Sequence, residues 1–474
     1  MIQHCNGATM DTSPRPATER EQHVKARRAA SASAVGSLVE WYDFGLYGAA
    51  AALIFKDYFF GTDDAFVGLM AAFATFAVGY FARPFGGVVF GHLGDKVGRK
   101  PVMVGTLALM GVSTTLIGLL PGYDTLGWFA PFLLVLLRLL QGLGAGAEYA
   151  GAVVLSSESS PPGRRGFFAS WSGAGVWVGS ALGLAVFQAM HALTGDSFET
   201  WGWRVPFLLS IALLAISLYI RRQVEETESF TETKEAAREE NVPLVRLLRT
   251  EKRRLLAALG SNVILSGYSY IPQVWILSYL TENVGVAAGL ALAINAIVLL
   301  SGALFMPYFG SLGDRFGRRK LFLFGTGFGV LWPVPMFLLI DTHNTALIIL
   351  GIVVCFVGAV AVCYAAQAAF LTEMFPPAIR YSGIAFARET SGALLAGTTP
   401  MVATGLLHLA GHWWPIALCM TVYAAIALVA VYYSRQFRSD ADQADPDAFK
   451  ADEAWTRTPG AGTEKNETTA KAVR

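Results

Sequence analysis

The sequence predicts an all-α membrane protein with twelve transmembrane helices arranged in two pseudo-symmetric six-helix halves. Three observations lead to this fold class. Of the 474 residues, 54% are hydrophobic and only 15% charged, with a mean hydropathy of +0.47, whereas soluble domains are about one quarter charged. Twelve mostly apolar segments approach the roughly 20 residues that cross a bilayer. A loop motif also recurs at equivalent places in the first and last six segments.

The apolar segments and the polar stretches between them define the expected parts of the chain. The segments cover residues 30–55, 66–92, 101–120, 129–157, 166–190, 203–221, 254–280, 288–312, 320–340, 345–373, 380–407 and 413–434. We therefore predict a cytoplasmic tail (1–29), a first six-helix bundle (30–221), a cytoplasmic linker rich in Glu and Arg (222–253), a second six-helix bundle (254–435) and a disordered cytoplasmic tail (436–474).

The loop charges predict the orientation in the membrane. Alternate loops are rich in Lys and Arg, and the loops between them have almost none. Because basic loops stay on the cytoplasmic side, we expect both termini in the cytoplasm of a cell that carries the protein in its inner or plasma membrane. The net charge of +1 provides no basic field for nucleic acid. We expect a lipid bilayer around the protein, no nucleic-acid partner, and a monomer.

The recurring loop follows the second helix of each half. It consists of Gly-His-Leu-Gly-Asp-Lys-Val-Gly-Arg at 91–99 and Gly-Ser-Leu-Gly-Asp-Arg-Phe-Gly-Arg at 310–318. Asp95 and Asp314 are suited to a helix N-terminus, whose partial positive charge favours a carboxylate, and Arg99 and Arg318 can pair with these acids. We predict a cytoplasmic latch that closes in one transport state and opens in the other. The alternative is a basic turn that only sets orientation.

Charged residues within the apolar segments are the main candidates for function, because each costs about 2.5–3.5 kcal/mol at a helix centre. At 1.5 Å per residue, Asp43 in the first helix and Arg138 in the fourth lie at about the same depth. We predict an Asp43–Arg138 pair, with Glu40, on the same helix face, as the alternative acid. Protonation of the carboxylate would free the arginine for an anionic substrate group. The alternative is a permanent structural ion pair.

Arg388 and Glu389 are adjacent in the eleventh helix and point about 100° apart, so we expect one to face the cavity and the other a neighbouring helix. Arg388 is either a ligand for a substrate carboxylate or a structural lock on the cytoplasmic side. The other candidate substrate-binding residues are polar or aromatic side chains of the first, fourth, fifth and seventh helices: Tyr47, Arg138, Gln141, Trp171, Trp177, Tyr270 and Gln273.

Motifs for enzymatic chemistry are absent from the sequence. There is no Walker loop, HExxH or GxSxG motif, and none of the four cysteines forms a CxxC pair. We therefore expect no cofactor, no metal and no enzymatic activity. Transport would draw on an ion gradient or on the gradient of the substrate itself.

The two loop motifs and the layout of six plus six helices resemble the major facilitator superfamily. The first helix, Gly-Ser-Leu-Val-Glu-Trp-Tyr-Asp-Phe-Gly-Leu-Tyr-Gly at 36–48, is similar to the metabolite:proton symporter family, as are 76–87, 138–142 and 201–207. The first half is most similar to the shikimate-transporter branch, whereas Arg388-Glu389 stands where that branch is expected to have uncharged polar residues. By this resemblance Glu40, Asp43 and Arg138 fall on motif positions of the family.

The resemblance implies a proton-coupled symporter for a small polar metabolite. We expect import of an organic acid such as shikimate, 2-oxoglutarate or citrate by alternating access, with an organic anion or zwitterion and protons as the small partners. Two alternatives stay open. One is a proton antiporter that exports a metabolite or drug, and the other is a nutrient sensor with this fold that does not transport.

Overall fold

The computed structural model describes residues 19–97, 99–146, 164–223, 251–375 and 377–434, and these residues form helices and connecting turns without strands. The tail expected at 436–474 and most of the expected linker lie outside the described residues. The elements that follow the first six predicted segments are α1 (Glu19–Ala50), η1 (Ala51–Phe55), α2 (Lys56–Tyr58), α3 (Ala65–Val97), α4 (Arg99–Leu119), α5 (Tyr123–Leu126), α6 (Phe129–Ala145), α8 (Arg165–Thr194), η2 (Gly195–Ser197), η3 (Phe198–Gly202) and α9 (Arg204–Gln223).

The elements that follow the last six predicted segments include several short π-helical turns. They are α12 (Lys252–Val263), η4 (Ile264–Tyr268), η5 (Ile271–Trp275), α13 (Ile276–Glu282), α14 (Ala288–Phe316), α15 (Arg318–Leu331), α16 (Pro333–Ile340), α17 (Thr345–Cys355), η6 (Phe356–Ala361), α18 (Val362–Met374), α19 (Pro377–Ser391), η7 (Gly392–Ala396), α20 (Thr399–Ala410) and α21 (Trp414–Tyr433).

The membrane-spanning character of the fold is clear over the described ranges. Seven helices are long and apolar enough to cross a membrane, and α15 with α16 forms an eighth such segment bent by 47°. Parts of α4, α6 and α9 form shorter apolar helices, and 252–282 supplies the remaining predicted segment. Each of the twelve predicted segments therefore has a helical counterpart, and the predicted fold class is confirmed.

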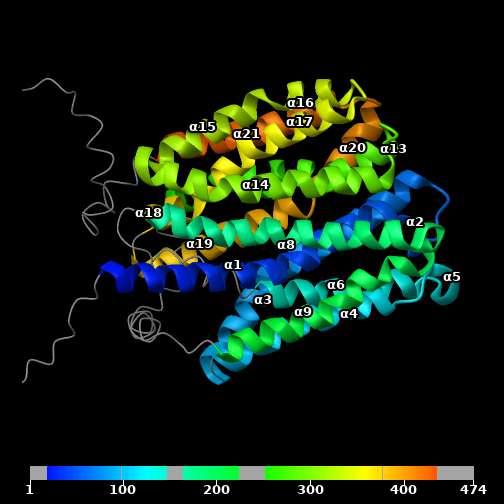
Figure 1. Ribbon diagram of the computed structural model, residues 1–474, viewed down its shortest axis with the longest axis horizontal. Helices are drawn as coiled ribbons and strands as arrows, with labels where there is room; N and C mark the ends of the chain where they lie inside the picture. Colours follow the sequence, from blue (N-terminus) through cyan, green and yellow to red (C-terminus); the bar gives the residue numbers. More distant parts are fainter. Residues whose placement is uncertain (1–18, 98, 147–163, 224–250, 376, 435–474) are drawn as a thin grey trace, which may run out of the picture.

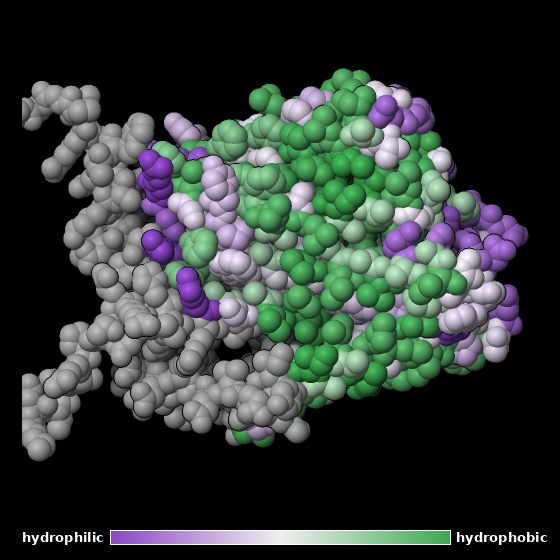
Figure 2. Space-filling model, in the orientation of Figure 1, coloured by the Kyte–Doolittle hydropathy of each residue, from purple (hydrophilic) through white to green (hydrophobic). Residues whose placement is uncertain are grey.

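On the face shown in Figure 2, apolar side chains cover the middle of the molecule and polar side chains gather toward its two ends. Large apolar side chains point outward, such as Leu304 at 76% exposure and Leu331 at 74%. In water this surface would be unfavourable, whereas a bilayer is as apolar as these side chains. The surface is therefore that of a multi-pass membrane protein.

α8 occupies the centre of the fold, because it packs along α1 on one side and along α14 on the other (Figure 1). α1 belongs to the first set of helices and α14 to the second, so α8 joins the two sets over much of its length. α1 begins at the left end of Figure 1, where α14 also meets α15, whereas α2, α5, α13 and α20 lie toward the right end.

Glycine brings α3 and α6 unusually close together. A Cβ atom at Gly142 in α6 would lie 2.1 Å from the carbonyl oxygen of Gly79 in α3, and real Cβ atoms do not approach a backbone oxygen so closely. This contact fixes α6 against α3, and these two helices carry Arg138 and Arg83. The glycine at position 142 therefore permits this close contact between the two helices.

We expect Gly142→Ala to lower the thermal stability of the detergent-purified protein, because the added methyl group must push α6 away from α3. The expected loss is about 1–3 kcal/mol, as for other overpacked interiors, measured by thermal unfolding of the purified protein. Gly405→Ala in α20 is the matched control, since no atom lies within 4 Å of a Cβ there. A Gly142→Ala protein as stable as the control would contradict the account.

Candidate functional site

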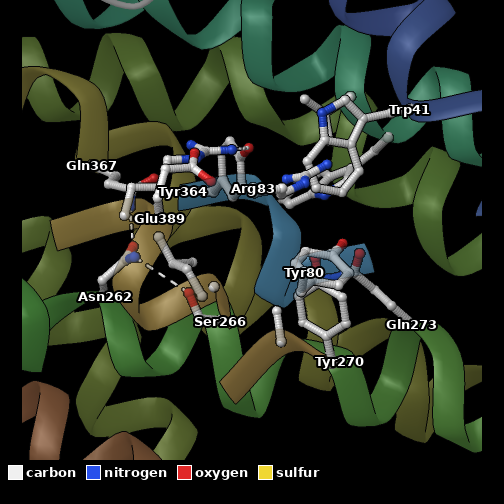
Figure 3. Close-up of a pocket in the computed structure, with 16 residues that line it drawn as sticks. Trp41, Tyr80, Arg83, Asn262, Ser266, Tyr270, Gln273, Tyr364, Gln367 and Glu389 are labelled. Atoms are coloured by element: carbon white, nitrogen blue, oxygen red, sulfur yellow. Dashed lines mark hydrogen bonds between the residues drawn. The ribbon is translucent and has the colours of Figure 1, made fainter. Parts of the chain in front are cut away.

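A small cavity with a volume of about 40 Å³ lies between the two sets of helices (Figure 3). Six of the twelve predicted segments contribute to its wall, namely the first, second, fifth, seventh, tenth and eleventh. The lining residues are Trp41, Tyr80, Arg83, Val176, Trp177, Asn262, Leu265, Ser266, Tyr270, Gln273, Tyr364, Gln367, Arg388, Glu389, Gly392 and Ala396.

Arg83 of α3 is the cation on the α1–α3 side of the cavity. It is 6% exposed, and its Nη2 lies 3.7 Å from Oε1 of Glu40 in α1. Its guanidinium carbon also lies 5.4 Å from the ring centroid of Trp41 and 4.7 Å from that of Tyr80. Glu40 therefore forms an ion pair with Arg83, whereas the sequence predicted it as the alternative partner of Arg138.

Asp43 of α1 is buried at 3% exposure and accepts two hydroxyl hydrogen bonds. Thr114 of α4 donates to Oδ2 at 2.7 Å, and Ser210 of α9 donates to Oδ1 at 2.7 Å. The Thr114 hydroxyl in turn accepts a hydrogen bond of 2.8 Å from Nε2 of Gln141, and Arg138 donates to Oε1 of the same Gln141. Asp43 is thus joined to Arg138 by a chain of hydrogen bonds through two neutral side chains.

The predicted direct pair is therefore corrected, because Asp43 and Arg138, both in described parts of the chain, form no ion pair with each other. Sequence spacing placed Asp43 and Arg138 at similar depths, as the structure has them. The side chains of Thr114 and Gln141, however, fill the gap between these two residues. Ser210 was also missed. A lone Thr or Ser in an apolar helix carries no sequence signal for such a role, since most bond their own helix backbone.

Arg138 is completely buried, and its planar guanidinium lies among aromatic rings. Its Cζ lies 3.9 Å from the ring centroid of Tyr47 and 4.8 Å from that of Phe44. Arg83 approaches the same Phe44 ring at 4.1 Å. Cation–π contacts of this kind stabilise a desolvated guanidinium. Phe44 is thus in contact with both arginines, and Glu40, Asp43, Arg83 and Arg138 form one buried cluster, which we call the α1 charge cluster.

Arg388 and Glu389 of α19 both line the cavity. The expectation that only one of them would face it is therefore wrong. Two neighbours on a helix diverge by about 100°. Both can still line a cavity when the side of the helix midway between them faces that cavity. Arg388 donates a hydrogen bond of 3.3 Å to the hydroxyl of Tyr364.

Neutral polar groups form the wall beside Glu389 (Figure 3). Gln367 of α18 donates from Nε2 to Oδ1 of Asn262 in α12, and Asn262 donates to the hydroxyls of Ser391 and, at 3.3 Å, Ser266. This network connects α12, α18 and α19 within the second set of helices. None of these four residues was singled out from the sequence.

Two tyrosines meet across the cavity from opposite sets of helices. The hydroxyls of Tyr80 in α3 and Tyr270 of the seventh segment are 2.6 Å apart, and their rings are nearly perpendicular at 87°. Trp177 of α8, 1% exposed, packs against Tyr364 at 5.1 Å between ring centroids. The predicted binding residues Trp177, Tyr270, Gln273 and Arg388 are thus brought together in one cavity.

Other predicted binding residues lie elsewhere. Trp171 is 42% exposed and stacks edge-on against Phe167, so the prediction that it lines the cavity is wrong. Trp171 lies six residues before Trp177 in α8, which is about 9 Å along the helix from the cavity wall. Tyr47, Arg138 and Gln141 are also absent from the cavity wall. Tyr47 instead donates a 2.6 Å hydrogen bond to Thr75 while its ring covers Arg138.

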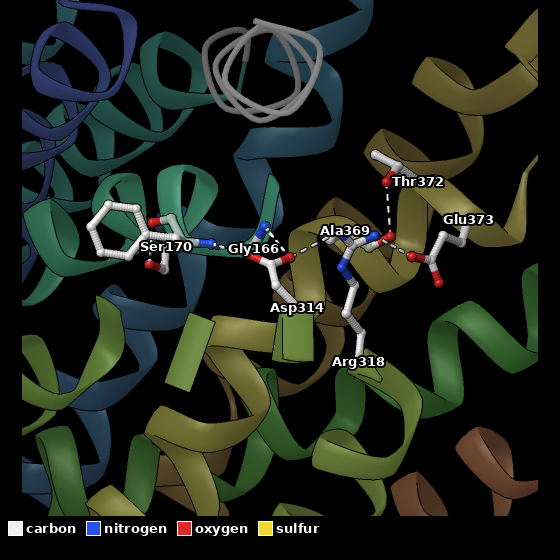
Figure 4. Close-up of polar contacts among 8 residues, drawn as sticks. Gly166, Ser170, Asp314, Arg318, Ala369, Thr372 and Glu373 are labelled. Atoms are coloured by element: carbon white, nitrogen blue, oxygen red, sulfur yellow. Dashed lines mark hydrogen bonds and ion pairs between the residues drawn. The ribbon is translucent and has the colours of Figure 1, made fainter. Parts of the chain in front are cut away.

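Asp314, at the end of α14, caps the N-terminus of α8 (Figure 4). Its two carboxylate oxygens accept hydrogen bonds of 2.8 and 2.9 Å from the backbone N–H groups of Gly166 and Phe167. Arg318 lies 3.0 Å from Asp314 and also forms an ion pair with Glu373 of α18. Asp314 thus lies at a helix N-terminus and pairs with Arg318, as the sequence predicted, while the opening and closing of a latch stays a prediction. The side chains of Asp95 and Arg99 lie outside the described residues.

Glycine is needed where α14 and α8 meet at the latch. A Cβ at Gly310 would lie 2.6 Å from the carbonyl oxygen of Gly166, and a Cβ at Gly166 would lie 2.7 Å from that of Gly310. The first glycine of the repeated loop motif therefore permits backbone contact between the helices. Asp314, four residues further along α14, can reach the α8 N-terminus because of this approach.

The opposite end of the molecule also has contacts between the two sets of helices. Lys56 of α2 and Glu282 of α13 form an ion pair of 2.5 Å. Phe66 of α3 stacks on His408 of α20 with ring centroids 3.9 Å apart. Contacts thus join the two sets of helices at both ends of the molecule, with the cavity between them.

No group of three or more potential metal-ligating residues occurs in the described ranges. The site is instead a cavity with charged, amide and aromatic walls inside a membrane-spanning helical bundle, which is the architecture of a secondary transporter. A family model described as "Major Facilitator Superfamily" matches residues 33–397 and 261–462. The chain belongs to the major facilitator superfamily, and it is a transporter rather than an enzyme.

Two similar proteins are transporters of Escherichia coli (strain K12). The shikimate transporter is 38% identical over 402 residues, which cover 83% of this chain and 91% of the relative. The proline/betaine transporter is 35% identical over 421 residues, covering 85% and 82%. Among solved structures, the proton:xylose symporter XylE matches with a TM-score of 0.63 at 18% identity, covering 88% of this chain and 96% of that one. The latter match shows the shared fold.

We expect Asp314→Asn to loosen the contact between α14 and α8, because an amide bonds the α8 N-terminus and Arg318 less strongly than a carboxylate does. The measurement is maleimide labelling of a cysteine placed at buried Ser170, after replacement of the native cysteines. Labelling should become about tenfold faster, as expected when a charged hydrogen bond is lost. Arg315→Gln, at an exposed neighbour, is the control, and equal labelling of both variants would refute the latch.

Proposed function

We propose that this protein is a proton-coupled symporter that imports a small polar metabolite bearing a carboxylate, by alternating access. The observation that carries the proposal is the α1 charge cluster, in which Asp43 is linked to Arg138 by hydrogen bonds while Arg83 faces the cavity. Titratable residues inside a membrane protein often mark proton and substrate pathways. The family and the two bacterial relatives support a transport role for this cluster.

Charge balance explains how a proton could be coupled to an anion. With Glu40 and Asp43 ionised, two acids balance the two arginines of the cluster. Protonation of Asp43 leaves a net charge of +1 in a region of low dielectric, where Coulomb interactions are strong. Arg83 then attracts a carboxylate into the cavity more strongly. By linkage, a bound carboxylate makes proton binding to Asp43 more favourable to the same extent.

The cavity wall supports a small polar substrate. Arg388 supplies a second cation, and Gln273, Asn262 and Gln367 supply amide groups. Aromatic rings complete the wall and can cover an apolar face of the substrate. The names of the relatives mention shikimate, proline and betaine, which are small carboxylates, and this agrees with such a wall.

We also propose the orientation and the division of the chain. The latch of α14 and α8 lies at the end where α1 begins (Figure 1), and the basic loops assign this end to the cytoplasm. The Lys56–Glu282 pair then lies on the outer side. The bundles at 30–221 and 254–435 would move relative to each other about the cavity, joined by the linker at 222–253.

We expect Asp43→Asn to abolish substrate accumulation driven by a pH gradient while sparing exchange of substrate across the membrane, because the amide cannot take up the proton. The measurement uses proteoliposomes with an imposed inward proton gradient and a panel of labelled carboxylates and betaines. Asp124→Asn, at an exposed position, is the matched control. Unchanged accumulation in Asp43→Asn would refute the role of Asp43, and accumulation favoured by an outward proton gradient would instead indicate antiport.

We expect Thr114→Val to weaken coupling without removing the titrating group, since valine has a similar shape but cannot link Asp43 to Gln141. Proton-driven accumulation should fall by about tenfold, which corresponds to the loss of one or two buried hydrogen bonds. The ratio of substrate accumulation to exchange, determined in the same proteoliposomes, reports this loss. Ser113→Ala removes a hydroxyl that bonds only its own helix backbone at Leu109, and it should leave the ratio unchanged.

A further inference from the structure

Asp43 faces a second cavity, which we call the side cavity. It has a volume of about 10 Å³ and lies between α1, α4 and α9, where α4 and α9 pack side by side (Figure 1). Among the described residues, none lines both this cavity and the one between the two sets of helices. The residues that line the side cavity are Val39, Asp43, Leu107, Met110, Gly111, Ser210, Leu213, Leu214 and Ser217.

The side cavity lies on the cytoplasmic side of Asp43 in the orientation that we propose. α1 begins at the cytoplasmic end, and Val39 comes one turn before Asp43. The lining part of α4, 107–111, likewise precedes the hydroxyl that donates to Asp43. α9 starts beside the last turn of α4 and runs in the opposite direction, and its lining residues continue to Ser217, two turns beyond Ser210.

The hydrogen-bond chain that joins Asp43 to Arg138 cannot carry a proton away from the carboxyl group. Gln141 donates from its amide nitrogen to Thr114, and Arg138 donates from its guanidinium to Gln141. An amide nitrogen and a guanidinium are donors and have no site that accepts a proton. The chain therefore transmits the charge of Asp43 but not its proton, and the proton needs another exit.

The charges near Asp43 permit an exit through the side cavity. Glu40 of α1 and Arg138 of α6 are the charged groups that act on the Asp43 carboxylate. α4 and α9 present hydroxyl groups to it, and the hydroxyl of the adjacent Tyr42 donates to a backbone carbonyl of α9. In the described wall of the side cavity, the residues other than Asp43 are neutral. A proton that leaves on this side therefore passes no cation of the wall.

The size and the polar groups of the side cavity suit one water molecule. A water molecule needs about 10–15 Å³ of such space and roughly two to four polar partners, and the volume here is about 10 Å³. The Asp43 carboxylate and the hydroxyls of Ser210 and Ser217 supply three partners. Both serines are buried and lie on one face of α9, where the other lining residues are leucines.

Resting on the proposed function, we propose that the side cavity is the route by which the proton leaves Asp43 for the cytoplasm, separate from the path of the substrate. The O–H bond of the protonated carboxyl group breaks, and a water molecule in the side cavity accepts the proton and passes a proton onward past Ser217 to the water of the cytoplasm. Asp43 remains as a carboxylate with its hydrogen bonds from Thr114 and Ser210. Ser217 is a positioning residue, because its small side chain leaves room for this water.

Ser217→Val tests the route, since two methyl groups fill space that the water needs. The test uses proteoliposomes with an inward proton gradient, a pH-sensitive dye inside, and labelled shikimate, proline and betaine as probes. We expect net uptake of substrate and of protons to slow together by about tenfold, the scale of one hydrogen bond to a charged group. Exchange at equal pH needs no proton release, so it should stay at the wild-type rate, which also shows that the variant is folded.

Two further measurements separate proton release from a packing defect. The ratio of net uptake rates in ordinary and heavy water should be larger for Ser217→Val than for the wild type, because proton release becomes the slow step. Ser217→Ala is the matched control. It removes the hydroxyl but keeps the space, in which water can bond Asp43 and Ser210, and its net uptake should stay close to that of the wild type.

Several outcomes would overturn the inference. Unchanged net uptake in Ser217→Val, or an equal loss in Ser217→Ala and Ser217→Val, would overturn it while leaving symport intact. If Ser217→Val also loses exchange, Ser217→Thr adds a single methyl group instead, and it must slow net uptake while sparing exchange, or the inference fails. No pH-driven uptake by the wild type of these probes or of any carboxylate in the wider panel would contradict the proposed symport itself.

Discussion

Charge neutrality in a medium that cannot solvate ions is the constraint on which the rest of this structure depends. α1, α3 and α6 bring two acids and two arginines into one buried region, and an isolated charge there would be costly. The two acids meet the constraint differently. Glu40 contacts Arg83 directly, whereas Asp43 reaches Arg138 only through Thr114 and Gln141. An acid held by neutral hydroxyls loses less on protonation than one in a direct ion pair, and this difference supports the proposal that Asp43, rather than Glu40, carries the proton.

The close approach of helices makes this neutrality possible. Arg138 is fully buried, and its side chain packs against Gly79 of α3, where a Cβ atom would lie only 2.5 Å from Nε. Gly142 brings the α6 backbone against α3, and the rings of Phe44 and Tyr47 cover the guanidinium. Small residues at helix contacts and large rings around the charges thus act together. In this half of the protein, the burial of the charges therefore depends on how closely the helices pack.

The sequence predicts the fold well because hydrophobic length and basic loops are strong, local signals. It predicts the depth of Asp43 and Arg138 for the same reason, since rise per residue is constant. It fails where the answer depends on which way a helix is rotated. Trp171 and the Arg388–Glu389 pair are of this kind, because rotation is set by neighbouring helices. The contacts of Thr114 and Ser210 with Asp43 could not be predicted, because hydroxyls in apolar helices are common and usually bond the backbone of their own helix.

The latch and the cavity are connected through one rigid element. α8 receives Asp314 at its N-terminus and presents Trp177 to the cavity about three turns further along, with no proline between Arg165 and Thr194. A helix of this length moves as a body, so a shift of α14 that releases Asp314 also changes the wall on which Trp177 packs against Tyr364. Two sites that bias one rigid element between two positions are coupled in free energy. In the transport cycle that we propose, occupation of the cavity and closure of the latch therefore depend on each other through α8, without any further chain of contacts.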